Sequence, residues 1–135
     1  MIYMINTTVS SELTVNNPIY DRRGDGNSSC YYDTFDLSVS IAGTYRIGSK
    51  SAMDTYGYLY NGSFIPNHPN LNLIASDDDS SGGAQFGFAL SLQPHAIYTL
   101  LVTTFSDFET GPYTVIASGL QRVTLTRTSI VGTTP

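Results

Sequence analysis

Residues 35–41 read Phe-Asp-Leu-Ser-Val-Ser-Ile, so that apolar and polar side chains alternate at every step. Because neighbouring side chains of a strand point to opposite faces, this period of two predicts a half-buried β-strand, with Phe35 and Ile41 on its inward face. Ala42-Gly43 follows as a turn, and Tyr45 and Ile47 then continue the alternation. Two alternating runs around a short turn indicate an antiparallel hairpin.

The alternation returns along the rest of the chain, with turn residues between the segments. The segment 97–105 is apolar on both faces at several points, which predicts a central strand. About eight or nine strands with regularly spaced turns predict an all-β fold, an antiparallel β-sandwich of the jelly-roll kind. Besides 35–41, the expected strands are 44–49, 56–60, 71–76, 84–92, 97–105, 113–118 and 123–130, with one more within 2–15.

The composition agrees with this fold and excludes several functions. A length of 135 residues favours one domain. Good helix formers for exposed positions are scarce, because the chain has one Lys and two Glu against nine Asp and 32 Ser and Thr. A net charge of −5 gives no electrostatic basis for binding nucleic acid or an anionic membrane. No apolar run is long enough to span a bilayer, so we expect no membrane insertion.

Three glycosylation sequons indicate an extracellular or cell-surface protein. Their acceptors are Asn6, Asn27 and Asn61. The first residues do not form a complete signal peptide, and we therefore expect a mature fragment or a module of a longer secreted chain. Cys30 is the single cysteine, which leaves two interpretations: a small buried apolar side chain or an intermolecular disulfide.

Short blocks of sequence between residues 31 and 119 follow one another in a characteristic order. In order and spacing, they resemble the bacterial pre-peptidase C-terminal domain family, whose relatives include the collagen-binding domains of clostridial collagenases. The blocks are Tyr32-Asp33-Thr34-Phe35, Ala42-Gly43-Thr44-Tyr45, Asp54-Thr55-Tyr56-Gly57-Tyr58-Leu59-Tyr60, Leu73-Ile74-Ala75-Ser76-Asp77-Asp78-Asp79, Tyr98-Thr99-Leu100-Leu101-Val102 and Gly111-Pro112-Tyr113.

The resemblance implies a jelly-roll-like sandwich without catalytic activity. Such domains are appended to secreted proteases or occur in surface proteins, and some of them bind calcium. The resemblance covers residues 31–119. An N-terminal strand and loop segment (1–30) and a C-terminal strand and tail (120–135) lie outside it.

A run of three carboxylates, Asp77, Asp78 and Asp79, predicts a calcium site. Adjacent like charges repel each other, and a cation with several oxygen ligands relieves the repulsion. Asp54 is the expected fourth ligand, and Asp21, Asp25 or Asn27 are further candidates from an early loop. The alternative is a solvated turn in which aspartates cap backbone N–H groups.

Two other features offer binding chemistry. Arg23, Gly24 and Asp25 form an RGD tripeptide in a loop, which is either a receptor motif or ordinary turn chemistry. Tyr56, Tyr58 and Tyr60 share one strand face. Exposed, they would stack on sugar rings, whereas packed they would support the sandwich with their hydroxyls at the rim.

No catalytic motif occurs in the sequence. His68 and His95 each adjoin a proline and lack metal-ligand spacing, and neither a nucleophile elbow nor a phosphate-binding loop is found. We therefore expect a protein that is not an enzyme.

The β-prone ends lead to the functional expectation. If an end strand pairs with the next copy, the contact is head-to-tail and builds a fibre. We expect a structural or adhesive extracellular glycoprotein module, calcium-stabilised and self-assembling through its terminal strands into a fibril or surface layer. The alternative is an accessory module of a larger secreted hydrolase that binds collagen-like matrix protein or a glycan.

Overall fold

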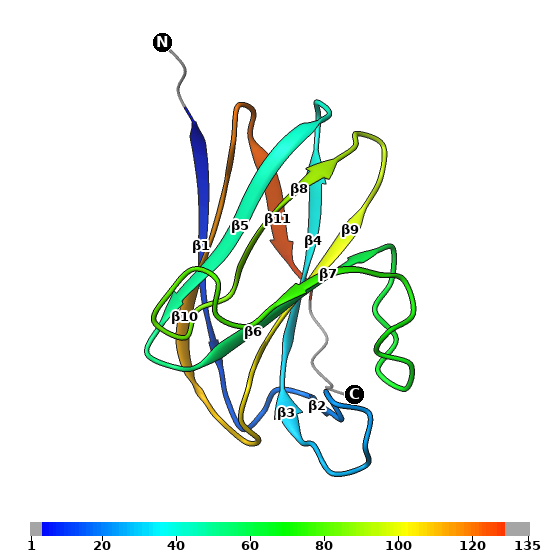
Figure 1. Ribbon diagram of the computed structural model, residues 1–135, viewed down its shortest axis with the longest axis vertical. Helices are drawn as coiled ribbons and strands as arrows, with labels where there is room; N and C mark the ends of the chain where they lie inside the picture. Colours follow the sequence, from blue (N-terminus) through cyan, green and yellow to red (C-terminus); the bar gives the residue numbers. More distant parts are fainter. Residues whose placement is uncertain (1–3, 129–135) are drawn as a thin grey trace.

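In the computed structural model, two antiparallel sheets pack face to face (Figure 1). The structure describes residues 4–128. One sheet has four strands in the order β1-β10-β5-β8, and the other has five in the order β11-β4-β9-β6-β7. The predicted all-β antiparallel sandwich is therefore confirmed. The strands are β1 (Ile5–Leu13), β2 (Ile19–Tyr20), β3 (Cys30–Tyr31), β4 (Asp33–Val39), β5 (Gly43–Ser51), β6 (Thr55–Asn61), β7 (Leu73–Asp77), β8 (Gly87–Leu92), β9 (Tyr98–Thr104), β10 (Gly111–Gly119) and β11 (Val123–Arg127).

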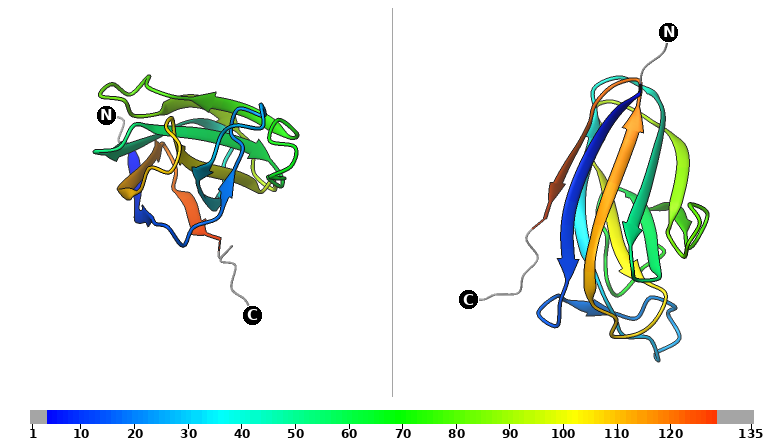
Figure 2. Two further views of the ribbon diagram at one scale, coloured as in Figure 1. Left: turned by 90° about the horizontal axis from the view of Figure 1, so that it is seen from below. Right: turned by 90° about the vertical axis from the view of Figure 1, so that its left-hand side faces the viewer.

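Both terminal strands pair within the chain. β1 lies along β10 from Ile5 opposite Gly119 to Leu13 opposite Gly111, at the edge of the four-stranded sheet. β11 lies along β4 at the edge of the other sheet. The Thr7 hydroxyl donates to the Val123 carbonyl (2.9 Å), which links the two edges. Figure 2 shows this side of the sandwich, with both strands running along it.

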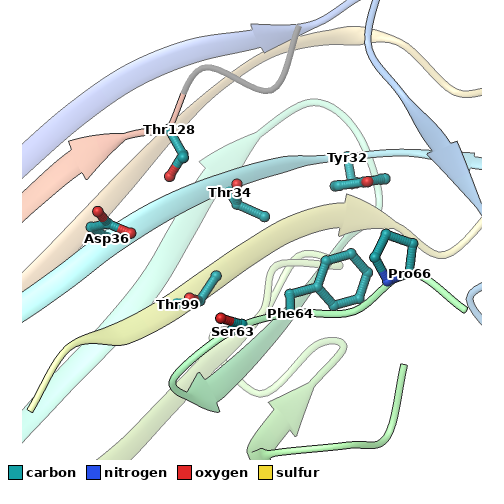
Figure 3. A pocket seen from close by; sticks show the side chains of 8 residues that line it. All are labelled: Tyr32, Thr34, Asp36, Ser63, Phe64, Pro66, Thr99 and Thr128. Carbon is teal, nitrogen blue, oxygen red and sulfur yellow. The ribbon is translucent and has the colours of Figure 1, made fainter. Parts of the chain in front are cut away.

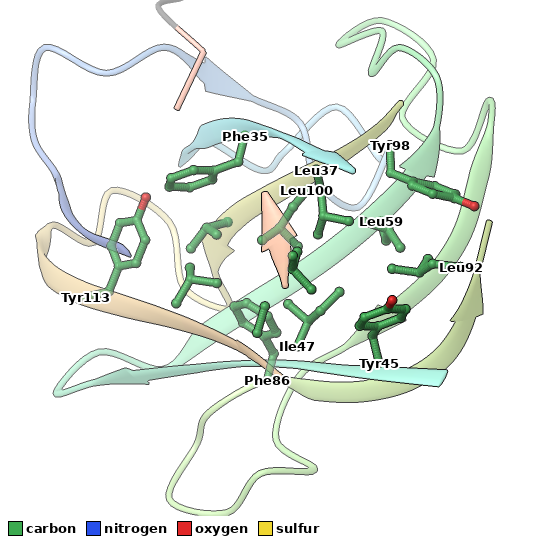
Figure 4. Packing of buried hydrophobic residues seen from close by; sticks show 14 of the residues in the cluster. Phe35, Leu37, Tyr45, Ile47, Leu59, Phe86, Leu92, Tyr98, Leu100 and Tyr113 are labelled. Carbon is green, nitrogen blue, oxygen red and sulfur yellow. The ribbon is translucent and has the colours of Figure 1, made fainter. Parts of the chain in front are cut away.

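The alternation of the sequence produces the core between the sheets. Phe35 and Leu37 from β4 are fully buried and face Tyr45 and Ile47 from β5 (Figure 4). β9 lies between β4 and β6, as its two apolar faces predict. Its outward residue Leu101 is also fully buried, because a second layer of side chains covers this face of the sheet.

That second layer is a small aromatic core outside the sandwich. The two-stranded ribbon of β2 and β3 and the β6–β7 loop cover the outer face of the five-stranded sheet there. Tyr20 packs edge-on against Tyr32 with a centroid distance of 5.1 Å, and Phe64 from the loop lies 5.2 Å from both rings. The N-terminal segment thus contributes a layer of packing in addition to β1.

Some predicted details were wrong. Ile41 is 52% exposed, because β4 ends at Val39 and the chain is already turning at Ile41. The strand expected over 84–92 begins only at Gly87. The outer ends of two predicted strands, at residues 2–3 and 129–130, lie outside the described residues.

No helix within residues 4–128 is long and apolar enough to cross a membrane.

Candidate functional site

Two of the predicted calcium ligands meet at one edge of the five-stranded sheet. Asp54 precedes β6, and Asp78 follows β7. Because these strands are antiparallel neighbours, the start of one lies beside the end of the other. The topology therefore brings together two carboxylates that are far apart in the sequence.

The pair is short of hydrogen-bond donors. The Oδ1 atoms of Asp54 and Asp78 are both buried, and neither has a hydrogen-bond partner within residues 4–128. Burial raises the pKa of Asp78, and the negative charge of Asp54 raises it further. Glu109 lies nearby, and burial together with the charge of Asp54 raises the pKa of its carboxyl as well. The positive charge of Arg22 acts in the opposite direction on the pKa of Asp78, so this edge of the sheet combines three carboxylates with one guanidinium.

Asp77 and Asp79 are placed differently from this pair. The Asp77 carboxylate accepts hydrogen bonds from the Ser80 amide (2.8 Å), the Ser80 hydroxyl (2.6 Å) and the Gly87 amide (2.8 Å). Burial alone would raise the pKa of Asp77, but these hydrogen bonds outweigh it and lower the pKa. Asp79 is exposed. Asp77 thus behaves as the loop cap that the alternative interpretation describes.

The early-loop candidates are bound within their own loop. The Asp21 carboxylate accepts from the Gly26 amide (2.6 Å) and the Ser28 amide (3.3 Å), and these bonds lower its pKa. Asp25 accepts from the Asn27 amide (2.9 Å). Within residues 4–128, no group of three or more His, Cys, Asp or Glu side chains is arranged to hold a metal ion. A cation at this edge would therefore need oxygens from the backbone or from water in addition to Asp54 and Asp78.

The RGD tripeptide lies in this early loop with all three residues exposed. Gly24 has a φ of +70°, a left-handed conformation that suits glycine. The Arg23 Nε lies 3.6 Å from the Asp25 Oδ2, so the two charges pair with each other. The Arg23 Nη2 also lies 3.8 Å from the Asp107 Oδ1, so both an ion pair within the tripeptide and one to the β9–β10 loop hold this turn.

The predicted tyrosine face exists and is covered. Tyr56 and Tyr58 stack with a centroid distance of 4.8 Å, and the Tyr60 hydroxyl donates to the Pro69 carbonyl (2.8 Å). The Arg22 guanidinium lies over the Tyr56 ring at 4.6 Å and donates to the Tyr58 hydroxyl (3.3 Å). Burial raises the pKa of Tyr58 to about 12. Tyr58 and Tyr60 are therefore packing residues, as the second of the two interpretations predicts.

The sequon asparagines and both histidines are exposed, whereas the single cysteine is buried. Asn6, Asn27 and Asn61 are exposed, in β1, in the early loop and at the end of β6. Cys30 is fully buried, and its thiol lies 3.7 Å from an Asp107 carboxylate oxygen. Burial raises the pKa of this thiol, which disfavours the reactive thiolate. His68 and His95 are exposed.

The sequence reasoning missed a buried carboxylate. Asp33 is fully buried where β4 begins. Its carboxylate accepts hydrogen bonds from Tyr113, from Asn17 (2.7 Å), from Arg127 (2.6 Å) and from Ser11 (3.2 Å). The sequence pattern could have revealed this residue, because Asp33 has the same parity as the inward residues Phe35 and Leu37. A charge on an inward face requires partners.

A second buried polar group was also missed. The Ser49 and Thr55 hydroxyls lie 2.6 Å apart, and Ser49 donates to the Gln85 side-chain oxygen (3.0 Å). The Gln85 amide group donates to the Met53 carbonyl (2.8 Å). This network ties the β7–β8 loop to the start of β6, next to Asp54.

No protein-family model matches the chain, and no curated protein matches its sequence significantly. The resemblance to the pre-peptidase C-terminal domains therefore stays a prediction.

Proposed function

We propose that the protein is a non-catalytic, extracellular structural or adhesive β-sandwich module that binds calcium at the edge where Asp54 and Asp78 meet. The observation that carries the proposal is the pair of buried carboxylate oxygens for which residues 4–128 provide no hydrogen-bond donor. Buried polar atoms in proteins nearly always have partners, so two facing acceptors without any favour a cation between them. The exposed sequon asparagines are compatible with an extracellular location.

Calcium suits this edge better than a softer metal. Calcium prefers oxygen ligands and tolerates irregular geometry, so that carbonyl oxygens and water complete its coordination. Bound there, it would remove the repulsion between Asp54 and Asp78 and fix the β7–β8 loop relative to the start of β6. The function of the ion is therefore to stiffen the module.

Thermal unfolding tests the calcium proposal. Adding millimolar calcium to protein freed of metal with a chelator should raise Tm by several degrees, because a ligand that binds only the folded state stabilises it. Asp78→Asn should abolish the rise, whereas Asp36→Asn, an exposed aspartate on β4, should retain it. An unmoved Tm in the wild-type protein would refute the proposal.

Self-assembly through a terminal strand is the second proposal, and the edge position and shallow burial of β1 favour it. β1 pairs with β10 over nine positions, yet among its side chains only Leu13 is buried. Nine paired backbone positions, buried Leu13 and the hydroxyl contacts of Thr7 and Ser11 attach this strand, and β1 of another copy would supply the same contacts. Exchange of β1 from one copy to the next is a head-to-tail contact and extends into a fibre.

An engineered disulfide between β1 and β10, which can be reduced again, tests the exchange. The Ser10 and Thr114 hydroxyls lie 3.0 Å apart on β1 and β10, and we expect Ser10→Cys with Thr114→Cys to join these strands. At high concentration the wild-type protein should form oligomers or fibres, visible by light scattering and electron microscopy. The oxidised variant should stay monomeric, and reduction should restore assembly. Wild-type protein that stays monomeric, or equal assembly in both oxidation states, would exclude exchange of β1.

A further inference from the structure

The outer face of the five-stranded sheet carries an open hollow of about 320 Å³ beside the outer aromatic core. Figure 3 shows it, with polar side chains at one end and rings at the other. Its volume falls at the lower end of the range typical of small-molecule sites, roughly 300–1,000 Å³. It is remote in the sheet from the Asp54–Asp78 edge, because Asp36 is on β4 and the carboxylate pair is at β6 and β7.

Strand alternation places the polar end of the hollow. Thr34 and Asp36 are on the outward face of β4, opposite in parity to the buried Phe35 and Leu37. Thr99 lies opposite Asp36 on the neighbouring strand β9.

The chain that follows β11 brings one more hydroxyl to the hollow, on the side of β4 away from β9. β11 ends at Arg127, and the next residue, Thr128, donates its amide to the Thr34 carbonyl (2.8 Å). The tertiary structure thus collects hydroxyls around one carboxylate.

These polar groups have unused hydrogen-bonding capacity. Within residues 4–128, the Asp36 carboxylate accepts no hydrogen bond and forms no ion pair, since the ion pairs there are those of Asp25, Asp107 and Asp33. The Thr128 Oγ1 is buried without a partner among the same residues. The Thr99 hydroxyl donates to the Gly62 carbonyl (2.6 Å), which leaves its lone pairs free as acceptors. A buried hydroxyl without a partner calls for a water molecule or a ligand, and here it borders an open hollow.

The other end of the hollow is apolar and held in place. Phe64 and Pro66 from the β6–β7 loop line it together with Tyr32. Phe64 packs against three rings at centroid distances of 5.2 Å, those of Tyr20, Tyr32 and Tyr60. The apolar end is therefore preformed, which lowers the entropic cost of binding.

We propose that this hollow binds a saccharide ring. A sugar combines an apolar C–H face, which suits Phe64 and Pro66, with a rim of hydroxyls, which suits Asp36 and the threonines. A carboxylate accepting from two neutral hydroxyls makes the stronger, charge-assisted kind of hydrogen bond. Asp36 is the one charged residue that lines the described hollow, so an anionic ligand is disfavoured. The inference is independent of calcium and of strand exchange.

Amide chemical-shift perturbation on the full chain tests the inference. The probes are the methyl glycosides of glucose, galactose and mannose, together with N,N′-diacetylchitobiose. Each is added to about 20 mM, a concentration that nearly saturates a site with a Kd of about 1 mM. We expect at least one of them to shift the amides of Thr34, Asp36 and Thr99 in a saturable manner. Asp36→Asn should weaken that binding roughly tenfold or more, and Thr128→Val should weaken it less.

Glu12→Gln is the matched control. It removes one exposed carboxylate from β1, in the other sheet, and should leave the sugar affinity unchanged. Tetramethylammonium chloride serves as a competing probe. Shifts with this cation and none with any sugar would overturn the inference in favour of an amine site. No saturable shift with any sugar, or sugar binding indifferent to Asp36→Asn, would also overturn it.

Discussion

Asp33 and the pair Asp54–Asp78 are carboxylates in opposite situations within one sandwich. Asp33 is fully buried, and Ser11, Asn17, Tyr113 and Arg127 donate hydrogen bonds to it. The pair is partly exposed, and each of its members has a buried oxygen that lacks a donor within the described chain.

The number of hydrogen-bond partners distinguishes a carboxylate that supports the fold from carboxylates that are candidates for binding a ligand. Ser11 and Tyr113 come from the four-stranded sheet, whereas Asp33 and Arg127 belong to the five-stranded one, so a single carboxylate joins both layers. Removal of one member of such a buried network is strongly destabilising, because it leaves the other members buried without partners. Neighbouring carboxylates whose Oδ1 atoms lack donors within residues 4–128 leave coordination sites for something from outside the chain.

The largest expected effect is at Asp33. Asp33→Ala leaves the Tyr113 hydroxyl and the Asn17 amide without their acceptor, and should lower the free energy of unfolding by about 3 kcal/mol or more. Urea unfolding measures the loss. The control is Asp36→Ala, three residues along β4 and exposed, which should change stability by less than about 0.5 kcal/mol. Equal effects of the two substitutions would contradict the structural role of Asp33.

Tyr113→Phe isolates one bond of this network. It removes a donor to Asp33 without creating a cavity, and should cost about 1–2 kcal/mol, because the buried carboxylate loses a partner. Tyr31→Phe is the control, since the Tyr31 hydroxyl makes no hydrogen bond with described residues, and it should be nearly neutral. The comparison is again made by urea unfolding, and a neutral Tyr113→Phe would mean that the remaining donors suffice.

Asp77→Ala tests the capping carboxylate next to the pair. Loss of the bonds to Ser80 and Gly87 should cost about 1 kcal/mol at neutral pH. Because folding lowers the pKa of Asp77, its stabilising effect is fully present above the ordinary aspartate range. The effect is lost as the pH falls from that range through the lower folded pKa. The difference in stability between wild type and variant should therefore shrink in acid, and a constant difference would contradict this role.

Asp78→Asn should have the smallest effect and the opposite sign. Without calcium it removes repulsion with Asp54, and should stabilise the protein by roughly 0.5 kcal/mol at neutral pH, since solvent screens partly exposed charges. Folding raises the pKa of Asp78, so the wild-type protein loses stability as the pH rises from the ordinary aspartate range through the folded value. The advantage of the variant should therefore disappear in acid. Destabilisation at neutral pH without calcium would show that Asp78 is a structural carboxylate like Asp33.

Most of the sandwich could be predicted from the sequence, because strand burial follows a local period of two. Phe35, Leu37, Tyr45 and Ile47 are buried as their parity predicts. The prediction failed where a strand ends, at Ile41, since strand ends depend on turns and on the length of neighbouring strands rather than on parity. The face of Tyr56, Tyr58 and Tyr60 was also predicted, but its cover was not, because Arg22 and Phe64 reach it from distant parts of the chain.

In the candidate calcium site, too, the sequence predicted some features and the tertiary structure decided others. Asp54 was predicted to join Asp78, and the antiparallel pairing of β6 and β7 does bring their segments together. Asp77 was expected to bind the same ion, but its side chain points to the loop cap, because neighbouring residues in an extended segment face opposite ways.

The sequence by itself determined that this chain forms sheets, which side chains face the interior, and where carboxylates and hydroxyls are concentrated, because all three depend on composition and on the spacing of near neighbours. Only the tertiary structure decided which carboxylates acquire partners. Asp33 receives its donors from three other strands and a turn. The Oδ1 atoms of Asp54 and Asp78 receive none from the described part of the chain. The reason is that hydrogen-bond partners in a sandwich come from segments whose proximity is set by the order of strands in its sheets.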